Sequence, residues 1–212
     1  KLEKVASGEI DRLIVNMPPR HSKSELASYL MPAWFLGRNP KLKIIQATHN
    51  TELAVRFGRK VRDLIDSEEY AHIFPDTDLK ADSKAAGRWE TSAGGEYFAA
   101  GVGGGITGKG AHVLVIDDPV KNREDAESQN NRDANWDWYT STAYTRLAPG
   151  GGVLVILTRW HDDDLAGRLL RMGTDGGDEW EVVRYPAIAE LDEEFRVTGQ
   201  PLHAERYNFE SL

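Results

Sequence analysis

The chain has 212 residues, of which 40% are hydrophobic and 28% are charged, and it contains no cysteine. This composition is typical of a globular protein, and the length suits one α/β domain with at most a short appendage. The lack of cysteine excludes disulfides and thiolate metal sites. No apolar run reaches the ~20 residues of a membrane span and no secretory leader is recognisable, so we expect a soluble, intracellular protein. A net charge of −8 excludes a uniformly basic surface for nucleic acid and leaves room for a local basic strip.

Apolar runs of strand length alternate with longer helical patterns. Strands are predicted at residues 12–17, 43–48, 112–116, 153–157 and 180–185, and a hairpin at residues 88–92 and 96–100. Helices are predicted at residues 24–36, 51–66, 123–146 and 162–172. The runs at 112–116 and 153–157 are continuously apolar, which is typical of parallel strands covered on both faces. We therefore predict an α/β fold with a mostly parallel sheet flanked by helices on both faces.

The predicted helix at residues 51–66 is amphipathic. Its apolar face consists of Ala54, Phe57, Val61, Leu64 and Ile65. Arg56, Arg59 and Lys60 lie on its polar face. This pattern favours a solvated face paired with Glu52, and contact with DNA phosphates or with a neighbouring subunit is the alternative.

Two stretches compete as a nucleoside-triphosphate loop. Such a loop needs backbone N–H groups in a tight turn, a lysine for the β- and γ-phosphates, and a hydroxyl for Mg²⁺. Residues 103–110 (GGGITGKG) have both glycines of the G-x-x-x-x-G-K-[ST] consensus, but Gly110 replaces the hydroxyl residue. Residues 17–24 (MPPRHSKS) have Lys23 and Ser24 in place but lack both glycines.

The context of the two stretches favours residues 17–24. A phosphate loop leaves a strand and opens a helix, because the helix N-terminus supplies N–H groups and a positive dipole to the anion. Residues 17–24 lie between a predicted strand and a predicted helix, whereas residues 103–110 run directly into a strand and are predicted as part of a mobile loop with six glycines (101–110). The predicted nucleotide-binding residues are Pro19, Arg20, His21, Ser22, Lys23 and Ser24. Ser22 would then adopt a conformation that glycine adopts more easily; the alternative is a plain serine-capped turn.

The apolar strand HVLVI ends in two adjacent acids, Asp117 and Asp118, which is the Walker B pattern. We predict that Asp117 holds Mg²⁺ together with Ser24, and that Asp118 orients or deprotonates the attacking water. The alternative is that both acids cap a turn before Pro119. A strand candidate at residues 43–48, between the lysine loop and Asp117 in the sequence, indicates the additional-strand branch of P-loop NTPases.

The chain resembles the terminase large subunits of tailed bacteriophages from about residue 11 to residue 209. The resemblance is carried by MPPRHSKSE (17–25), FGRKVRDLI (57–65), TGKGAHVLVIDDP (107–119), WDWYTSTAYTRLAPGG (136–151), VILTRWHDDDLAGRLL (155–170) and PLHAERY (201–207). In that family a glycine-poor phosphate loop with an arginine is usual. The resemblance implies a P-loop ATPase of the additional-strand type that uses ATP and Mg²⁺ to move double-stranded DNA into a procapsid.

The same resemblance assigns roles to residues of the site. Lys23 and Ser24 would grip phosphate and Mg²⁺, and Arg20 would contact the γ-phosphate. Asp117 and Asp118 correspond to the Walker B aspartate and the catalytic carboxylate, although many relatives have glutamate at the second position.

Two further residues match family motifs outside the phosphate loop and the Walker B strand. Thr158 falls in the motif that couples hydrolysis to movement; a helix N-cap run is the alternative for this segment. Lys109 stands where relatives often have an arginine finger that acts on a neighbouring subunit's ATP. Lysine cannot make the bidentate phosphate contact of arginine, so the alternative for Lys109 is a solvated loop residue.

The resemblance also implies a domain plan and partners. We expect an ATPase domain at residues 1–186 and, at residues 187–212, a linker toward a nuclease domain that is absent, so no nuclease activity is expected. The adenine-binding segment is expected upstream of Lys1. The expected partners are double-stranded viral DNA, the portal protein, the terminase small subunit and other copies of the chain in a ring, in the host cytoplasm and without a membrane. The alternatives are a helicase-like nucleic-acid-remodelling ATPase and a degenerate, non-hydrolysing nucleotide- or DNA-binding scaffold.

Overall fold

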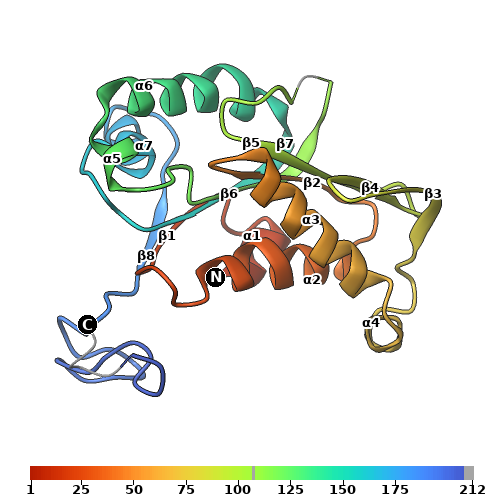
Figure 1. Ribbon diagram of the computed structural model, residues 1–212, viewed down its shortest axis with the longest axis horizontal. Coiled ribbons are helices and arrows are strands. Elements are labelled where there is room, and N and C mark those ends of the chain that lie inside the picture. Colours follow the sequence, from red (N-terminus) through yellow and green to blue (C-terminus); the bar gives the residue numbers. More distant parts are fainter. Residues whose placement is uncertain (107, 208–212) are drawn as a thin grey trace.

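The computed structural model describes residues 1–106 and 108–207 and is dominated by one sheet (Figure 1). The strands are β1 (Arg12–Asn16), β2 (Lys43–Thr48), β3 (Leu79–Ala85), β4 (Arg88–Thr91), β5 (Glu96–Gly101), β6 (Ala111–Asp117), β7 (Leu147–Leu157) and β8 (Glu181–Arg184). They are ordered β3-β4-β5-β2-β6-β7-β1-β8. All neighbours from β5 to β8 are parallel, whereas β4 and β3 add antiparallel at one edge. The predicted mostly parallel sheet and the β4–β5 hairpin are confirmed.

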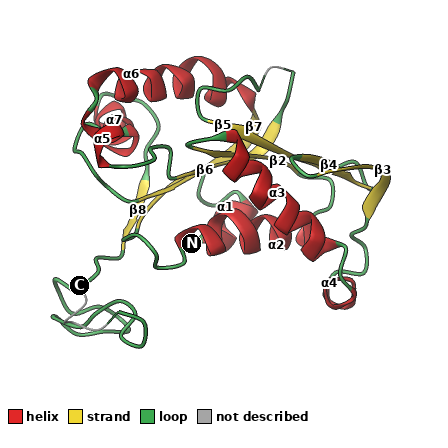
Figure 2. Ribbon diagram, viewed as in Figure 1, coloured by secondary structure: helices red, strands yellow, loops and turns green. Residues whose placement is uncertain are grey.

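Helices cover both faces of the sheet, as predicted (Figure 2). The helical segments are α1 (Leu2–Ser7), a π-helical turn η1 (Glu25–Leu30), α2 (Met31–Arg38), α3 (Thr51–Ile65), α4 (Glu68–Ile73), α5 (Arg123–Glu127), α6 (Gln129–Trp138), a second π-helical turn η2 (Tyr139–Ala143), a 3₁₀ turn η3 (Tyr144–Arg146) and α7 (Leu165–Thr174). α1, α2 and α3 lie on one face, and α5, α6 and α7 lie on the other. None of the described helices is long and apolar enough to span a membrane.

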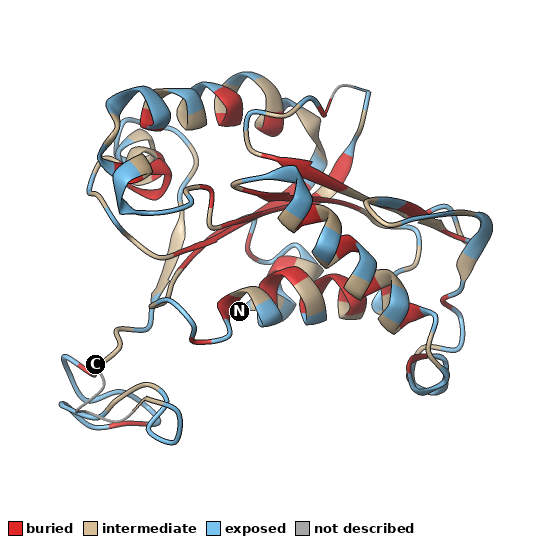
Figure 3. Ribbon diagram, in the orientation of Figure 1, coloured by how far each residue is buried: buried red, intermediate tan, exposed pale blue. Residues whose placement is uncertain are grey.

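The central strands are buried from both sides (Figure 3). In β6, Val113 and Val115 belong to the apolar cluster beneath α1–α3, whereas Leu114 and Ile116 belong to the cluster beneath α6 and α7. Successive side chains of a strand point to opposite faces. The continuous apolar run predicted for this strand therefore reflects two cores separated by one layer of sheet.

The sheet order shows where the additional strand lies, which the sequence did not predict. Residues 43–48 do form β2, but β2 lies outside β6, between β6 and β5. The strand that separates β1 from β6 is β7, which pairs with both. Order along the chain indicated an extra strand without indicating where it inserts, because a parallel strand can enter a sheet wherever its crossover helix permits.

Three segments were missing from the predicted elements: α1, α4 and β3. β3 is an edge strand whose residues are exposed or half-buried, so it lacks the apolar alternation that identifies a strand.

On α3, the buried positions are Ala54, Gly58, Val61 and Ile65, while Phe57 and Leu64 are only half-buried. Gly58 faces the sheet and its carbonyl accepts a hydrogen bond from the Trp89 indole at 3.0 Å.

Candidate nucleotide-binding site

The residues predicted to bind phosphate and metal converge at the carboxyl edge of the parallel strands. The register pairs Asn16 of β1 with Leu157 of β7, and Ile156 of β7 with Asp117 of β6. The loop after β1, the acids at the end of β6 and the segment after β7 therefore emerge side by side. This edge is where open α/β sheets bind their ligands.

The loop at residues 17–24 leaves β1 and opens a helix that runs from Lys23 to Arg38. Ser22 has a φ of 64° and Arg20 a φ of 61°, both in the left-handed region. The prediction for Ser22 is confirmed, and Arg20 adds a second strained position, each costing about 1–3 kcal/mol. Between them the buried His21 ring donates a hydrogen bond from Nδ1 to the Pro19 carbonyl at 2.8 Å.

Lys23 and Asp118 form an ion pair at the centre of the site. The Lys23 side chain is 7% exposed, and its Nζ lies 2.7 Å from Asp118 Oδ2. The other oxygen of Asp118 accepts the Thr158 backbone N–H at 3.0 Å. The Thr158 hydroxyl in turn donates to the Met17 carbonyl at 3.1 Å. Asp118 therefore connects the phosphate loop, the end of β6 and the tip of β7.

Asp117 is buried beside this pair and lacks full hydrogen bonding. Its Oδ2 accepts a hydrogen bond from the Ser28 hydroxyl at 2.5 Å, and within the described residues its buried Oδ1 has no partner. Burial raises the pKa of Asp117 to about 6, against the lowering effect of the Ser28 hydrogen bond and with a smaller raising effect from the Asp118 charge. The Ser24 hydroxyl also lies close enough to lower this pKa. A buried carboxylate with a free oxygen beside a hydroxyl is a donor set that suits a hard divalent cation.

Lys109 lies far from the other predicted residues. It precedes β6, at the amino edge of the sheet, and β6 spans about 20 Å from that edge to Asp117. Its ammonium forms an ion pair with Glu96 at the start of β5 and lies 5.5 Å from the centre of the Phe98 ring. Lys109 therefore does not reach the phosphate loop of its own chain.

In its described residues, the glycine-rich stretch lacks the strand-loop-helix context of a phosphate loop. It runs directly into β6 without a helix, as predicted. Thr107 lies outside the described residues. Ile106 is 1% exposed, and the Trp138 indole donates to the Gly104 carbonyl at 3.1 Å. These contacts attach Gly104 and Ile106 to the core, and the mobility of the stretch stays a prediction.

The whole site lies within a region that matches one protein family. Residues 14–211 match the family described as "Terminase large subunit, T4likevirus-type, N-terminal". The chain belongs to this family. Among curated proteins, none matches it in sequence.

Solved large terminases share the fold of this terminase chain. The large terminase of bacteriophage HK97 superposes with a TM-score of 0.51 at 14% identity, over 87% of this chain and 37% of the other. The large terminase of a thermophilic bacteriophage, solved in complex with ADP, superposes with a TM-score of 0.50 at 10% identity, over 87% and 44%. The chain thus spans less than half the length of these terminases, and at such identities the likeness shows a shared fold.

Two polar residues of the site, Ser28 and Gln46, were not predicted from the sequence. Ser28 contacts Asp117, and Gln46 on β2 contacts Ser28. A weak signal for each was present in the sequence. Ser28 follows Ser24 by four residues, which places both on the same helix face, and Gln46 is the one amide in the apolar run KIIQAT.

The hollows beside the site include two of several hundred Å³. One, of about 500 Å³, lies beside the loop and is lined among others by Met17, Arg159 and Tyr185. The other, of about 380 Å³, lies along the start of α3 and includes Arg56 and Arg59.

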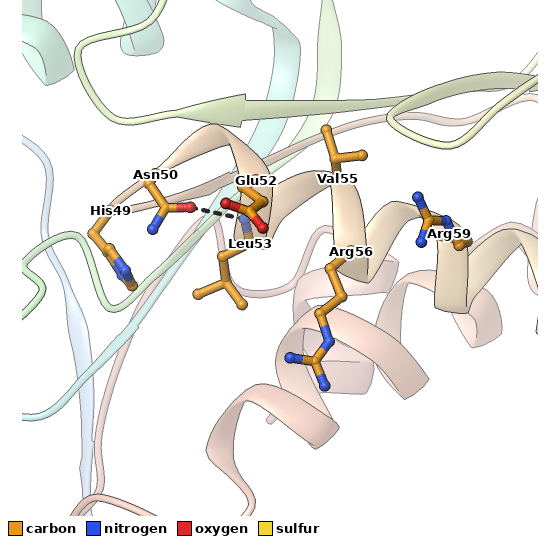
Figure 4. Close-up of a pocket in the computed structure, with 7 residues that line it drawn as sticks. All are labelled: His49, Asn50, Glu52, Leu53, Val55, Arg56 and Arg59. Carbon is orange, nitrogen blue, oxygen red and sulfur yellow. Dashed lines mark hydrogen bonds between the residues drawn. The ribbon is translucent and has the colours of Figure 1, made fainter.

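The hollow on α3 carries the basic face identified in the sequence (Figure 4). In the described part of the chain, no carboxylate lies within ion-pair distance of Arg56 or Arg59, whereas Lys60 pairs with Glu25 at 2.7 Å rather than with Glu52. The His49 backbone N–H, at the rim, donates to the Asp118 carbonyl at 3.2 Å. Two guanidiniums without an ion-pair partner among the described residues thus lie in this hollow, and His49 at its rim is hydrogen-bonded to the backbone of Asp118.

Proposed function

We propose that this chain is the ATP-hydrolysing motor domain of a large terminase and drives double-stranded DNA into a procapsid. The observation that carries the proposal is the cluster of Lys23, Ser24, Asp117 and Asp118 at the carboxyl edge of the sheet, with Lys23 Nζ 2.7 Å from Asp118. A lysine, a hydroxyl and two carboxylates are the groups that P-loop NTPases use. The large terminase of the thermophilic phage, which shares the fold, is described in complex with ADP.

The Lys23–Asp118 ion pair suggests how ATP engages the site. Lys23 forms a largely buried ion pair with Asp118. The β- and γ-phosphates offer the lysine a stronger anion, and they also accept backbone N–H groups of the loop and the exposed Arg20 side chain. Once released from Lys23, Asp118 can accept a hydrogen bond from the attacking water and align it with the γ-phosphate.

Ser24 and Asp117 are the residues that would hold Mg²⁺. The free, buried Oδ1 of Asp117 supports this assignment, because a bound cation would compensate its unmet charge. When bound, the metal neutralises charge that develops on the phosphates. The second oxygen of Asp117, Oδ2, is already held by the Ser28 hydroxyl.

Thr158 is the candidate for passing on the change at Asp118. Its backbone N–H binds Asp118 and its hydroxyl binds the carbonyl of Met17. A change of partner at Asp118 would therefore alter the contacts of Thr158 at the tip of β7 and, through Thr158, those of Met17 at the start of the phosphate loop. We assign Thr158 the coupling role on this basis.

The remaining partners belong to the same proposal. Arg56 and Arg59, unpaired among the described residues, are the candidate contact for DNA phosphates, and guanidiniums suit that ligand. Residues 1–186 would form the motor, and residues 187–212 a linker toward a nuclease domain. The portal protein, the small subunit and other copies in a ring would assemble with it in the host cytoplasm.

Phosphate release from ATP by the chain tests the proposal. We expect Mg²⁺-dependent release that rises when double-stranded DNA is added. Preferential stimulation by single-stranded DNA would favour the helicase-like alternative. Nucleotide binding without phosphate release, with or without DNA, would favour the non-hydrolysing scaffold.

We propose further that Lys109 acts on the ATP of a neighbouring copy. Lys109 precedes β6, which spans about 20 Å and ends at Asp117, and this leaves a second copy as the site that Lys109 could serve. To do so it must leave Glu96, its partner in the single chain. Activity per subunit is then expected to rise with protein concentration or on assembly at the portal.

Mixed assemblies provide the test of Lys109. Lys109→Ala subunits and Lys23→Ala subunits should each be nearly inactive alone, but a mixture contains interfaces with an intact Lys109 and an intact phosphate loop. We expect partial recovery of phosphate release in the mixture. Full activity of assembled Lys109→Ala alone would show that another basic residue, such as Arg146 or Arg159, has this role.

A further inference from the structure

Asp117 is held by a buried chain of polar side chains from two other elements. The Ser28 hydroxyl, on the π-helical turn, lies 2.5 Å from Asp117 Oδ2. The Gln46 amide, on β2, lies 2.9 Å from the Ser28 hydroxyl. Ser28 and Gln46 are both 0% exposed, and Asp117 is 1% exposed. No solvent therefore competes for these hydrogen bonds.

The chemistry of the three groups fixes the direction of the chain. An ionised carboxylate only accepts, so the single hydroxyl hydrogen of Ser28 must point to Asp117. The Ser28 oxygen can then only accept from Gln46, whose Nε2 donates to it. Gln46 thus fixes the Ser28 hydroxyl, and Ser28 fixes the carboxylate.

The result is a carboxylate with one oxygen occupied and one oxygen free. Oδ2 is bound to Ser28, while the buried Oδ1 has no hydrogen-bond partner among the described residues. Ser24 and Ser28 lie one helical turn apart on the face that contacts Asp117. A π-helical turn, rare in general and frequent at functional sites, contains Ser28.

We propose that Ser28 and Gln46 are positioning residues that hold the Asp117 carboxylate in the one rotation that presents Oδ1 to the metal of the nucleotide site. This inference rests on the proposed function, because it assumes that Asp117 is a metal ligand. Ser28 and Gln46 are both fully buried. Both act through Asp117, as outer residues commonly orient the ligands of a metal site.

The test measures metal affinity directly, by titration of the spin probe Mn²⁺ in the presence of a non-hydrolysable ATP analogue. Ser28→Ala should weaken Mn²⁺ binding about 10- to 100-fold, the usual effect of losing such an outer contact, without weakening analogue binding in the absence of metal. Ser28→Thr, which keeps the hydroxyl, should remain close to wild type. Gln46→Leu should weaken Mn²⁺ binding less, and should add nothing to Ser28→Ala because it acts through Ser28.

Thr77→Val serves as the matched control. Thr77 is 2% exposed and its hydroxyl donates to the Leu36 carbonyl at 3.3 Å, away from Asp117. The variant should lower the melting temperature as Ser28→Ala does and leave Mn²⁺ affinity unchanged. An equal loss of Mn²⁺ affinity in Thr77→Val would overturn the inference, since the effect would then be one of general stability.

Other outcomes separate this inference from the proposed function. If wild type binds Mn²⁺ with the analogue and folded Ser28→Ala binds it equally well, the positioning role is wrong and the proposed function stands. If wild type itself binds no metal with the analogue, the proposed function fails. If Ser28→Ala does not fold, Gln46→Leu provides the test. Unchanged Mn²⁺ affinity in folded Gln46→Leu contradicts the positioning role. A loss of Mn²⁺ affinity without weaker analogue binding in the absence of metal supports it.

Discussion

Lys23→Ala is expected to abolish ATP binding, whereas Lys109→Ala should leave binding by the single chain nearly intact. Lys23 Nζ is the buried cation that offsets Asp118. Without it, the carboxylates of Asp117 and Asp118 face the phosphates with no lysine between them, and like charges at such distances repel strongly in a partly buried site. Lys109 lies at the opposite edge of the sheet, paired with Glu96.

The measurement is the dissociation constant of a fluorescent ATP analogue for each variant. Thermal melting accompanies it, because loss of Lys23 leaves Asp118 without its partner in the free protein. A dissociation constant that rises strongly in Lys109→Ala and stays unchanged in Lys23→Ala would reverse the assignment in favour of the glycine-rich stretch.

Asp118→Asn should bind ATP normally but hydrolyse it about 10²–10⁴-fold more slowly, the usual contribution of general-base assistance. The amide oxygen of asparagine can still accept the Thr158 N–H, which Asp118 Oδ1 now binds at 3.0 Å, so the loop connections should persist. What is lost is the charge that orients or deprotonates the water.

Single-turnover phosphate release with saturating ATP measures this effect, since it isolates the chemical step. Asp63→Asn, at an exposed acid on α3 that pairs with Arg62, is the control and should retain full turnover. If Asp118→Asn kept most of the wild-type rate, a different acid would have to act as the base.

The strand-loop-helix context of residues 17–24 could be predicted from the sequence because its signal is local. A strand before residues 17–24 and a helix after them are both confirmed, and residues 103–110 run directly into β6, as predicted. The strain at Ser22 also followed from local reasoning, because a glycine-free loop must place another residue at positive φ.

Features that depend on long-range pairing could not be predicted in the same way. The position of β7 between β1 and β6 involves partners more than 100 residues apart for β1, and the ion pair of Lys109 with Glu96 depends on how two strand starts align. The role of Ser28 required knowing that β6 ends against the helix after the loop. The spacing of hydrophobic residues along the chain does not indicate which distant segments lie next to one another in the fold.

A crystal structure of the chain with Mg²⁺ and a non-hydrolysable ATP analogue tests the central claim most directly. We expect the β- and γ-phosphates within the loop of residues 17–24, Lys23 Nζ turned from Asp118 to the phosphates, and the metal beside the Ser24 hydroxyl and Asp117 Oδ1. Phosphates bound at the glycine-rich stretch before β6, or a nucleotide held with the Lys23–Asp118 pair unbroken and no metal at Asp117, would contradict the account.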